Sequence, residues 1–188
     1  NILPMKNYNG LIIASFLMLL IGLFDDIYHL APFIKLFFQI VPAVILFFYD
    51  YKIDLLTNPV TGETIILTPF ISFILTLIWI LALTNAFNLI DGMDGLAIGI
   101  TIIGACTMFI ISLNRGSEDI VSAILTVSLL GAAIGFIKYN FPPATIFMGD
   151  TGSLFIGFIL SAIGIIGINK STTAIALMVP IAAVGLPV

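Results

Sequence analysis

Long apolar runs separated by short polar stretches restrict the fold of this chain more than any other feature. Crossing a bilayer takes ~20 residues of helix, so the shorter runs are expected to extend into their polar flanks. Isolated strands cannot satisfy their backbone in lipid, whereas helices can. We therefore predict seven membrane helices, with Pro42 as a candidate kink, at Leu11–Phe24, Phe33–Tyr49, Pro69–Phe87, Leu96–Leu113, Ile120–Ile137, Leu154–Ile168 and Thr173–Val188.

Composition supports this assignment. Of the 188 residues, 61% are hydrophobic and 9% charged, with sixteen phenylalanines and a mean hydropathy of +1.25, which is more apolar surface than a soluble domain needs. A net charge of −4 argues against a nucleic-acid partner, and the single Cys106 excludes a disulfide framework. We expect one all-α polytopic helical bundle over residues 1–188. We also expect truncation at both ends, because the chain opens without methionine and stops inside an apolar run.

The only sizeable polar stretch lies between Tyr49 and Pro69. Asn58-Pro59 and Thr61-Gly62 are turn signals, and Thr64-Ile65-Ile66-Leu67 has the composition of a strand. A short hairpin is therefore expected here.

Successive membrane helices alternate direction, so the connections at 25–32, 88–95 and 138–153 share one face. The hairpin and the turns around Arg115 and Lys170 share the other. A carboxylate at the end of an apolar helix costs up to ~3 kcal/mol as it moves inward, so such groups usually face a cavity or a partner. The first face gathers Asp25, Asp26, Asn88, Asp91, Asp94 and Asp150.

One stretch of that face has a regular pattern: Asn85, Asn88, Asp91 and Asp94 recur at every third residue. This spacing places their oxygens on one side of a helix or a tighter turn, and such oxygen clusters suit Mg²⁺. The intervening glycines allow a ligand to approach the backbone closely. In a soluble protein the same stretch would be read as a loop.

The other polar groups of this face have two interpretations each. The adjacent carboxylates of Asp25 and Asp26 repel one another, and a divalent cation would relieve this; alternatively they are a polar stop to a helix. Asp150, between two glycines, is a metal ligand or a helix-start residue. Lys35 lies one turn inside an apolar run, from which it can reach the same face; it is a membrane anchor or, beside the carboxylates, holds a phosphate.

Carboxylates, amides and a lysine at a membrane face fit metal-assisted phosphoryl transfer. No Walker-type or dinucleotide glycine-rich loop is present in the sequence. Two other classes stay open at this point, namely a cation transporter that uses the carboxylates as an ion path and a non-catalytic membrane scaffold.

Three stretches resemble, in order and spacing, the signature motifs of the polyprenyl-phosphate N-acetylhexosamine-1-phosphate transferases, within glycosyltransferase family 4. They are Gly22-Leu23-Phe24-Asp25-Asp26, Asn85-Ala86-Phe87-Asn88-Leu89-Ile90-Asp91-Gly92-Met93-Asp94-Gly95-Leu96 and Phe147-Met148-Gly149-Asp150-Thr151-Gly152-Ser153. The resemblance implies a multi-pass enzyme of ten or eleven membrane helices. It would transfer a sugar-1-phosphate from a UDP-N-acetylhexosamine to undecaprenyl phosphate and release UMP, the first membrane step of a cell-envelope glycan such as lipopolysaccharide or teichoic acid.

The resemblance also implies roles for individual residues. Asp25 and Asp26 match the aspartates beside the lipid phosphate, with Asp25 a proposed base, and Lys35 matches a lysine near the diphosphate. Asp91 matches an aspartate near the catalytic centre. The implied metal ligands are Asn88 and Asp150, for Mg²⁺ or alternatively Mn²⁺, and the implied substrate contacts are Asp94, Asn85 and Gly95.

Two stretches, Asn85-Ala86-Phe87-Asn88 and Thr151-Gly152-Ser153-Leu154-Phe155-Ile156-Gly157-Phe158, resemble the GlcNAc-1-phosphate branch more than the phospho-MurNAc-pentapeptide branch, which stays the alternative. The resemblance places the site at the cytoplasmic face of the inner membrane, with the hairpin outside and a homodimer as one assembly to consider. Counting lysines and arginines over this chain gives the opposite orientation. For the orientation we follow the resemblance, because this count of lysines and arginines does not include the flanking segments that the family has.

Overall fold

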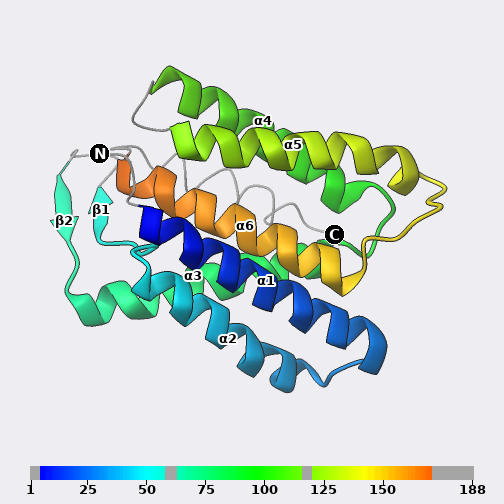
Figure 1. Cartoon of the computed structure of the whole chain (residues 1–188), viewed down its shortest axis with the longest axis horizontal. Coiled ribbons are helices and arrows are strands. Elements are labelled where there is room, and N and C mark those ends of the chain that lie inside the picture. Colours follow the sequence, from blue (N-terminus) through cyan, green and yellow to red (C-terminus); the bar gives the residue numbers. More distant parts are fainter. Residues whose placement is uncertain (1–4, 58–62, 116–119, 171–188) are drawn as a thin grey trace.

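The computed structural model of the protein describes residues 5–57, 63–115 and 120–170. Within these ranges the chain forms six helices and a two-stranded hairpin (Figure 1). Five of the helices are long and apolar enough to cross a membrane, and α2 is shorter. The elements are α1 (Met5–Tyr28), α2 (Pro32–Phe48), β1 (Leu55–Thr57), β2 (Thr64–Ile66), α3 (Pro69–Ile90), α4 (Leu96–Asn114), α5 (Ile120–Asn140) and α6 (Gly149–Lys170).

These elements confirm the predicted all-α membrane bundle, and Pro42 lies inside α2, which continues on both sides of it. The expected seventh span, Thr173–Val188, lies outside the described residues.

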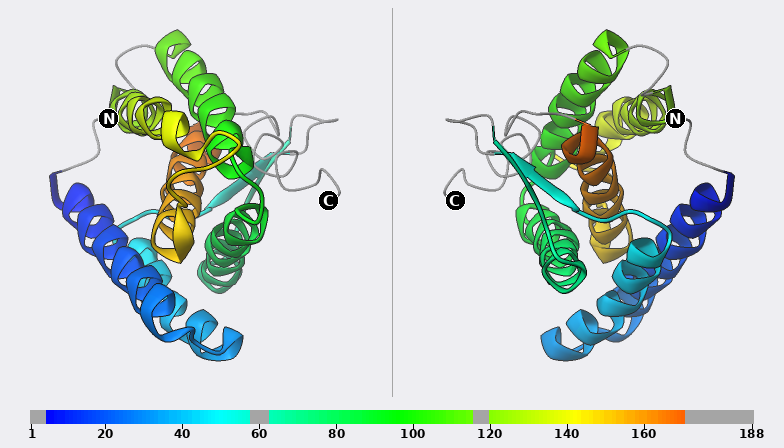
Figure 2. Two further views of the ribbon diagram at one scale, coloured as in Figure 1. Left: turned by 90° about the vertical axis from the view of Figure 1, so that its right-hand side faces the viewer. Right: turned by 90° about the vertical axis from the view of Figure 1, so that its left-hand side faces the viewer.

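Helix α6 is the centre of the bundle. It packs against α1 and α3, while α2 packs against the same two helices and α4 pairs with α5 (Figure 2). In its apolar span, 72% of the α6 residues are buried, against at most 39% in the other four spans. The first turn of α6 is therefore surrounded by the helices that bear the remaining candidate site residues.

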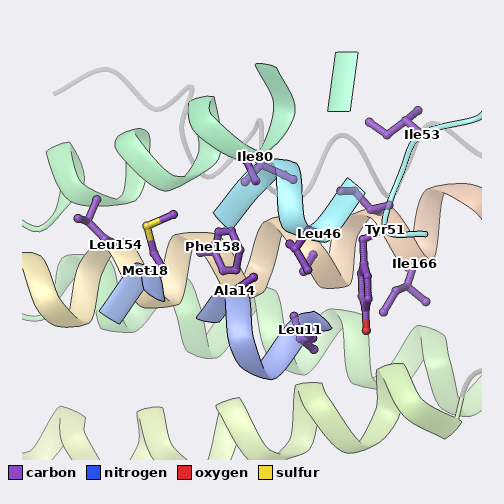
Figure 3. Close-up of a cluster of buried hydrophobic side chains, with 13 residues drawn as sticks. Leu11, Ala14, Met18, Leu46, Tyr51, Ile53, Ile80, Leu154, Phe158 and Ile166 are labelled. Carbon is purple, nitrogen blue, oxygen red and sulfur yellow. The ribbon is translucent and has the colours of Figure 1, made fainter. Parts of the chain in front are cut away.

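Side chains from several helices fill the space around α6. Leu11 and Met18 of α1, Leu46 of α2, Ile80 of α3 and Phe158 of α6 form one buried cluster (Figure 3). Because lipid is as apolar as these side chains, close packing rather than exclusion from water holds such a cluster together.

Glycines permit the closest contacts of α6 with its neighbours. A Cβ on Gly157 would lie 2.9 Å from the Thr84 Cα, and a Cβ on Gly22 would lie 2.5 Å from the Thr151 Cα. Small residues that allow backbones to approach are typical of helix contacts in membranes. Gly22 thus fixes the distance between α1 and the beginning of α6.

The predicted hairpin is confirmed, with β1 antiparallel to β2 and Leu55 opposite Ile66. Side chains of α3 attach the residues that precede its first strand to the bundle: the Thr76 hydroxyl accepts a hydrogen bond from the Ile53 N–H, and the Ser72 hydroxyl donates one to Asp54, both at 2.9 Å. The predicted turn residues 58–62 lie outside the described residues. In Figure 1 the hairpin is at the opposite end of the bundle from the beginning of α6.

The helices extend further than the apolar runs, as expected from their length. Asp25 and Asp26 lie in the last turn of α1, Asn88 in the last turn of α3 and Asp150 in the first turn of α6. The expected connections 25–32, 88–95 and 138–153 are correspondingly too long, and the observed ones are 29–31, 91–95 and 141–148. An α-helix keeps its backbone hydrogen-bonded until the chain leaves the apolar layer, which places the site on rigid elements.

Gly157→Ala should destabilise the bundle, because the added methyl group meets the backbone of α3. Overpacking of this kind costs about 1–3 kcal/mol. Gly104→Ala in α4 is the matched control, since a Cβ there meets nothing within 4 Å. Thermal unfolding in detergent should show a lower midpoint for Gly157→Ala alone; equal midpoints for the two variants would contradict the close contact of α3 with α6.

Candidate functional site

The ammonium group of Lys35 connects four helices. It donates hydrogen bonds to Asp25 Oδ2 of α1 at 2.6 Å, to Asp150 Oδ2 of α6 at 2.9 Å and to Asn88 Oδ1 of α3 at 3.2 Å. We call these four residues the lysine site. It confirms that the polar residues Asp25, Asn88 and Asp150 converge, and it adds that a lysine of α2 stands between them.

The connection from α1 to α2 brings Asp25 and Lys35 together. Asp25 is 4% exposed, and its second oxygen accepts a hydrogen bond from the Leu30 N–H at 2.7 Å. Pro32 begins α2, where its missing N–H leaves no unpaired donor. Lys35 then lies in the first turn of α2, directed back toward the end of α1.

The amide of Asn88 is oriented by its other partners. Its Nδ2 donates to Asp150 Oδ1 at 2.5 Å and to the hydroxyl of Ser153 at 3.0 Å. Both amide protons are thus used, and Oδ1 is directed at Lys35. Ser153 is fully buried and is connected to the lysine site through Asn88.

Asp26 caps α6 from the neighbouring helix. Its carboxylate accepts hydrogen bonds from the Asp150 N–H at 2.7 Å, from the Thr151 N–H at 2.9 Å and from the Thr151 hydroxyl. A carboxylate is favoured at a helix N-terminus by the unpaired N–H groups and the helix dipole. Gly149, with φ +65°, leaves room for it, since a Cβ there would lie 3.0 Å from both oxygens.

The sequence left open whether Asp150 caps α6 or binds a metal. Because Asp26 makes this cap, the carboxylate of Asp150 does not serve as the cap. It bonds Lys35 and Asn88 instead. The place of Asp26 beside a lipid phosphate stays a prediction, and both of its oxygens are engaged by α6.

A second polar group lies at the connection 91–95. Asp94 Oδ2 accepts a hydrogen bond from the Ala144 N–H at 2.9 Å, and Gly95 donates its N–H to Asn140 Oδ1 at 3.1 Å. Asn140 also donates to the Ile146 carbonyl at 3.1 Å. Asp94 and Gly95, which are predicted substrate contacts, thus join the connection 91–95 to the end of α5 and to the connection that follows it.

Asp91 ends α3 and is half-buried. Burial raises the pKa of its carboxyl to about 6, and the negative charges of Asp150 and Asp26 add to the effect. A divalent cation beside these three carboxylates would relieve that repulsion.

Asn85, the remaining predicted substrate contact, lies one turn before Asn88 on α3. Its side chain is paired with Gln39 of α2 and with the Leu81 carbonyl.

Sequence reasoning missed the roles of four residues: Gln39, Asn140, Thr151 and Ser153. Three of them, all but Thr151, are buried polar side chains. A polar residue inside or at the end of an apolar helix is the signal that could have found them, because such a group needs a partner.

The oxygens around Lys35 also fit a metal ion. Among the described residues no three His, Cys, Asp or Glu side chains are grouped as a metal site, but the carboxylates of Asp25 and Asp150 and the amide oxygen of Asn88 surround one ammonium group. The ammonium stands in for a hard cation, and these are the ligands that Mg²⁺ prefers.

The fold and the site define a class: a multi-pass membrane protein with a polar site, made of one lysine and three oxygen-bearing side chains, at the ends of its helices. Residues 8–168 match the family described as Glycosyl transferase family 4. The chain belongs to this family, which confirms the resemblance noted in its motifs.

Curated relatives cover most of the chain. It is 38% identical to a "Probable undecaprenyl-phosphate N-acetylglucosaminyl 1-phosphate transferase" of Bacillus subtilis (strain 168), over 94% of this chain and 48% of the relative. It is 36% identical to a "Decaprenyl-phosphate N-acetylglucosaminephosphotransferase" of Mycolicibacterium smegmatis, over 81% and 39%. A "Phospho-N-acetylmuramoyl-pentapeptide-transferase" of Streptococcus sanguinis is 35% identical, over 84% and 51%. The chain thus spans about half or less of the length of these relatives.

Asp91→Asn should stabilise the metal-free protein above pH 6. In the folded state the negative charge of Asp91 is disfavoured, so ionisation of this carboxyl destabilises the fold. This destabilisation is absent below the ordinary pKa of 3.8, grows as the pH rises and is complete above about 6. Unfolding midpoints measured with a chelator should therefore be higher for Asp91→Asn than for the unmodified chain at pH 8, and should converge toward pH 4.

Asp94→Asn is the control for this prediction, because its carboxylate accepts a backbone N–H. It should show no such gain at pH 8. A pH-independent difference between Asp91→Asn and the unmodified chain would contradict the repulsion.

Proposed function

We propose that this chain is part of a membrane transferase that moves N-acetylglucosamine 1-phosphate from a UDP-sugar to undecaprenyl phosphate. The observation behind the proposal is the lysine site, in which one cation and three oxygen side chains meet at the end of a membrane helix bundle. Family membership and the relatives' printed names support a polyprenyl-phosphate acceptor and an N-acetylglucosamine-type donor. The phospho-MurNAc-pentapeptide branch is the alternative donor class.

In the proposed reaction an oxygen of the lipid phosphate attacks the β-phosphorus of the UDP-sugar. A new P–O bond forms, the bond from the β-phosphorus to the bridging oxygen breaks, and UMP leaves. Lys35 lies where it can turn from the carboxylates to phosphate oxygens and balance their charge. Asp25, whose carboxylate accepts hydrogen bonds from Lys35 and the Leu30 N–H, would take a proton from the acceptor phosphate.

A direct attack by the lipid phosphate and a two-step route through an enzyme aspartate are both compatible with these contacts.

Asn88 and Asp150 would hold Mg²⁺, or Mn²⁺ in its place. The carboxylate of Asp91 would favour the ion, because its negative charge is repelled by those of Asp150 and Asp26. When bound, the ion supplies neutralisation of the phosphate charge. The role of the chain's own residues is to orient that site: Asp26 fixes the first turn of α6, and Ser153 fixes the amide of Asn88.

An apolar cleft beside the lysine site suits the chain of the acceptor lipid. It has a volume of about 430 Å³, lies between α1 and α2 and is lined by residues that include Leu20, Phe24, Leu30 and Phe38. Leu30 also donates its N–H to Asp25, so one end of the cleft adjoins the lysine site. An isoprenoid chain in this cleft would present its phosphate to Lys35, and we place this end of the bundle at the cytoplasmic face, where nucleotide sugars are made.

The direct test is UMP release by the complete natural protein, purified and given Mg²⁺, undecaprenyl phosphate and either UDP-GlcNAc or UDP-MurNAc-pentapeptide. We expect release with UDP-GlcNAc, and about a 100-fold or greater loss in Asp150→Asn, because the amide keeps the size but removes the charge that would bind the ion. Release with the pentapeptide donor alone would move the protein to the other branch. Ion flux without UMP release would instead support a cation transporter.

Replacement of Lys35 by methionine should tighten Mn²⁺ binding in the absence of substrates. In the free protein the ammonium competes with a divalent cation for the oxygens of Asn88 and Asp150, so its removal should lower the apparent dissociation constant about tenfold or more, which is ~1.4 kcal/mol. Electron paramagnetic resonance of free Mn²⁺ measures this without any turnover.

Lys138→Met is the charge-matched control, since Lys138 lies over the Tyr139 ring instead; it should leave Mn²⁺ affinity nearly unchanged. Asp150→Asn should weaken binding. Weaker Mn²⁺ binding in Lys35→Met would contradict a metal position shared with the ammonium.

A further inference from the structure

A pair of side-chain amides lies one helical turn deeper in the membrane than the lysine site. Asn85 Nδ2 donates to Gln39 Oε1 at 2.6 Å, and Gln39 Nε2 donates back to Asn85 Oδ1 at 3.4 Å. The second proton of Asn85 Nδ2 goes to the Leu81 carbonyl at 2.8 Å. Gln39 is fully buried. We call Gln39 and Asn85 the amide pair.

The amide pair repeats the contact of the lysine site between the same two helices. Gln39 follows Lys35 by four residues on α2, and Asn85 precedes Asn88 by three on α3. Both intervals are close to one turn, so each pair of residues lies on one face of its helix. The helices α2 and α3 therefore meet through two successive polar contacts, Lys35 with Asn88 and Gln39 with Asn85.

An amide pair fixes the register of two helices in a way that apolar side chains do not. Leucine or phenylalanine contacts are exchanged for similar ones when a helix slides or rotates. Displacing Gln39 from Asn85 would instead leave the fully buried amide of Gln39 without its partner, which costs free energy inside an apolar layer. A single buried polar residue is known to set helix register in coiled coils for the same reason.

We propose that Gln39 and Asn85 are positioning residues that hold Lys35 within reach of Asn88 and Asp150. The proposal rests on the proposed function for its catalytic consequence, although the structural coupling is independent of it. It gives Asn85 a role different from the substrate contact that the sequence predicts, because both amide protons of Asn85 are engaged within the protein.

Kinetics of the complete natural protein separate these two roles. Gln39→Leu and Asn85→Leu should each lower kcat by about 10- to 100-fold, the effect of a small misplacement of a reacting group, with the donor KM nearly unchanged. The exchange variant Gln39→Asn/Asn85→Gln keeps the combined length of the pair and should recover part of kcat.

The matched control is the hydroxyl pair Ser112 and Ser122, which joins α4 to α5 at 3.0 Å and is also buried. Ser112→Ala should lower the unfolding midpoint without lowering kcat. Equal kcat in the control and in Gln39→Leu would overturn the proposal, as would a raised donor KM with normal kcat in Asn85→Leu, which would make Asn85 a substrate contact.

A stability cycle tests the coupling without turnover. The change in unfolding midpoint caused by Lys35→Met should be smaller in a Gln39→Leu background than in the unmodified chain, because the register that Lys35 requires is no longer held. Additive changes would overturn the positioning role. If the unmodified protein releases no UMP but this coupling is present, the proposed function fails and the structural proposal stands.

Discussion

The structure depends on one partly buried cation, the ammonium group of Lys35, that three other helices share. Lys35 of α2 lies within hydrogen-bonding distance of Asp25 on α1, Asn88 on α3 and Asp150 on α6. In a bilayer, helices gain little from burying apolar surface against one another, so polar contacts and close packing determine how they are placed. Removing any one of these partners would leave a charge or an amide poorly paired at the edge of the apolar layer. The proposed function uses the same need, since a divalent cation or a phosphate would become a new partner for these groups.

Helix α6 is held in position by both charge and shape. The carboxylate of Asp26 accepts hydrogen bonds from the N–H groups of the first turn of α6. Gly22, one turn earlier on α1, permits the close approach of the two helices that brings this carboxylate within hydrogen-bonding distance of α6. The adjacent aspartates therefore have separate tasks, because neighbouring positions on a helix point in different directions. Asp25 is directed at Lys35 and Asp26 at α6.

The contacts arrange the polar residues by depth. At the end of the bundle, Asp94 and Gly95 bond the connection after α5 and Asn140 at the end of α5. Lys35 and its partners follow, and the pair of Gln39 and Asn85 lies one turn further along α2 and α3. An apolar cleft adjoins the middle level. The proposed acceptor, with a polar head and an isoprenoid tail, would match this order.

The sequence by itself determined the membrane helices, the hairpin and the gathering of Asp25, Asn88 and Asp150 at one end, because hydropathy and helix parity are local properties that lipid enforces. It also pointed to Lys35 as part of that group. Only the tertiary structure decided which partner each polar atom takes: that Asp26 caps another helix, that Asn85 pairs with Gln39, and that Asn140 and Ser153 belong to the polar network. These assignments depend on the distance and rotation between helices. Close approaches at Gly22 and Gly157 set that geometry, and a residue pattern along a single helix does not contain it.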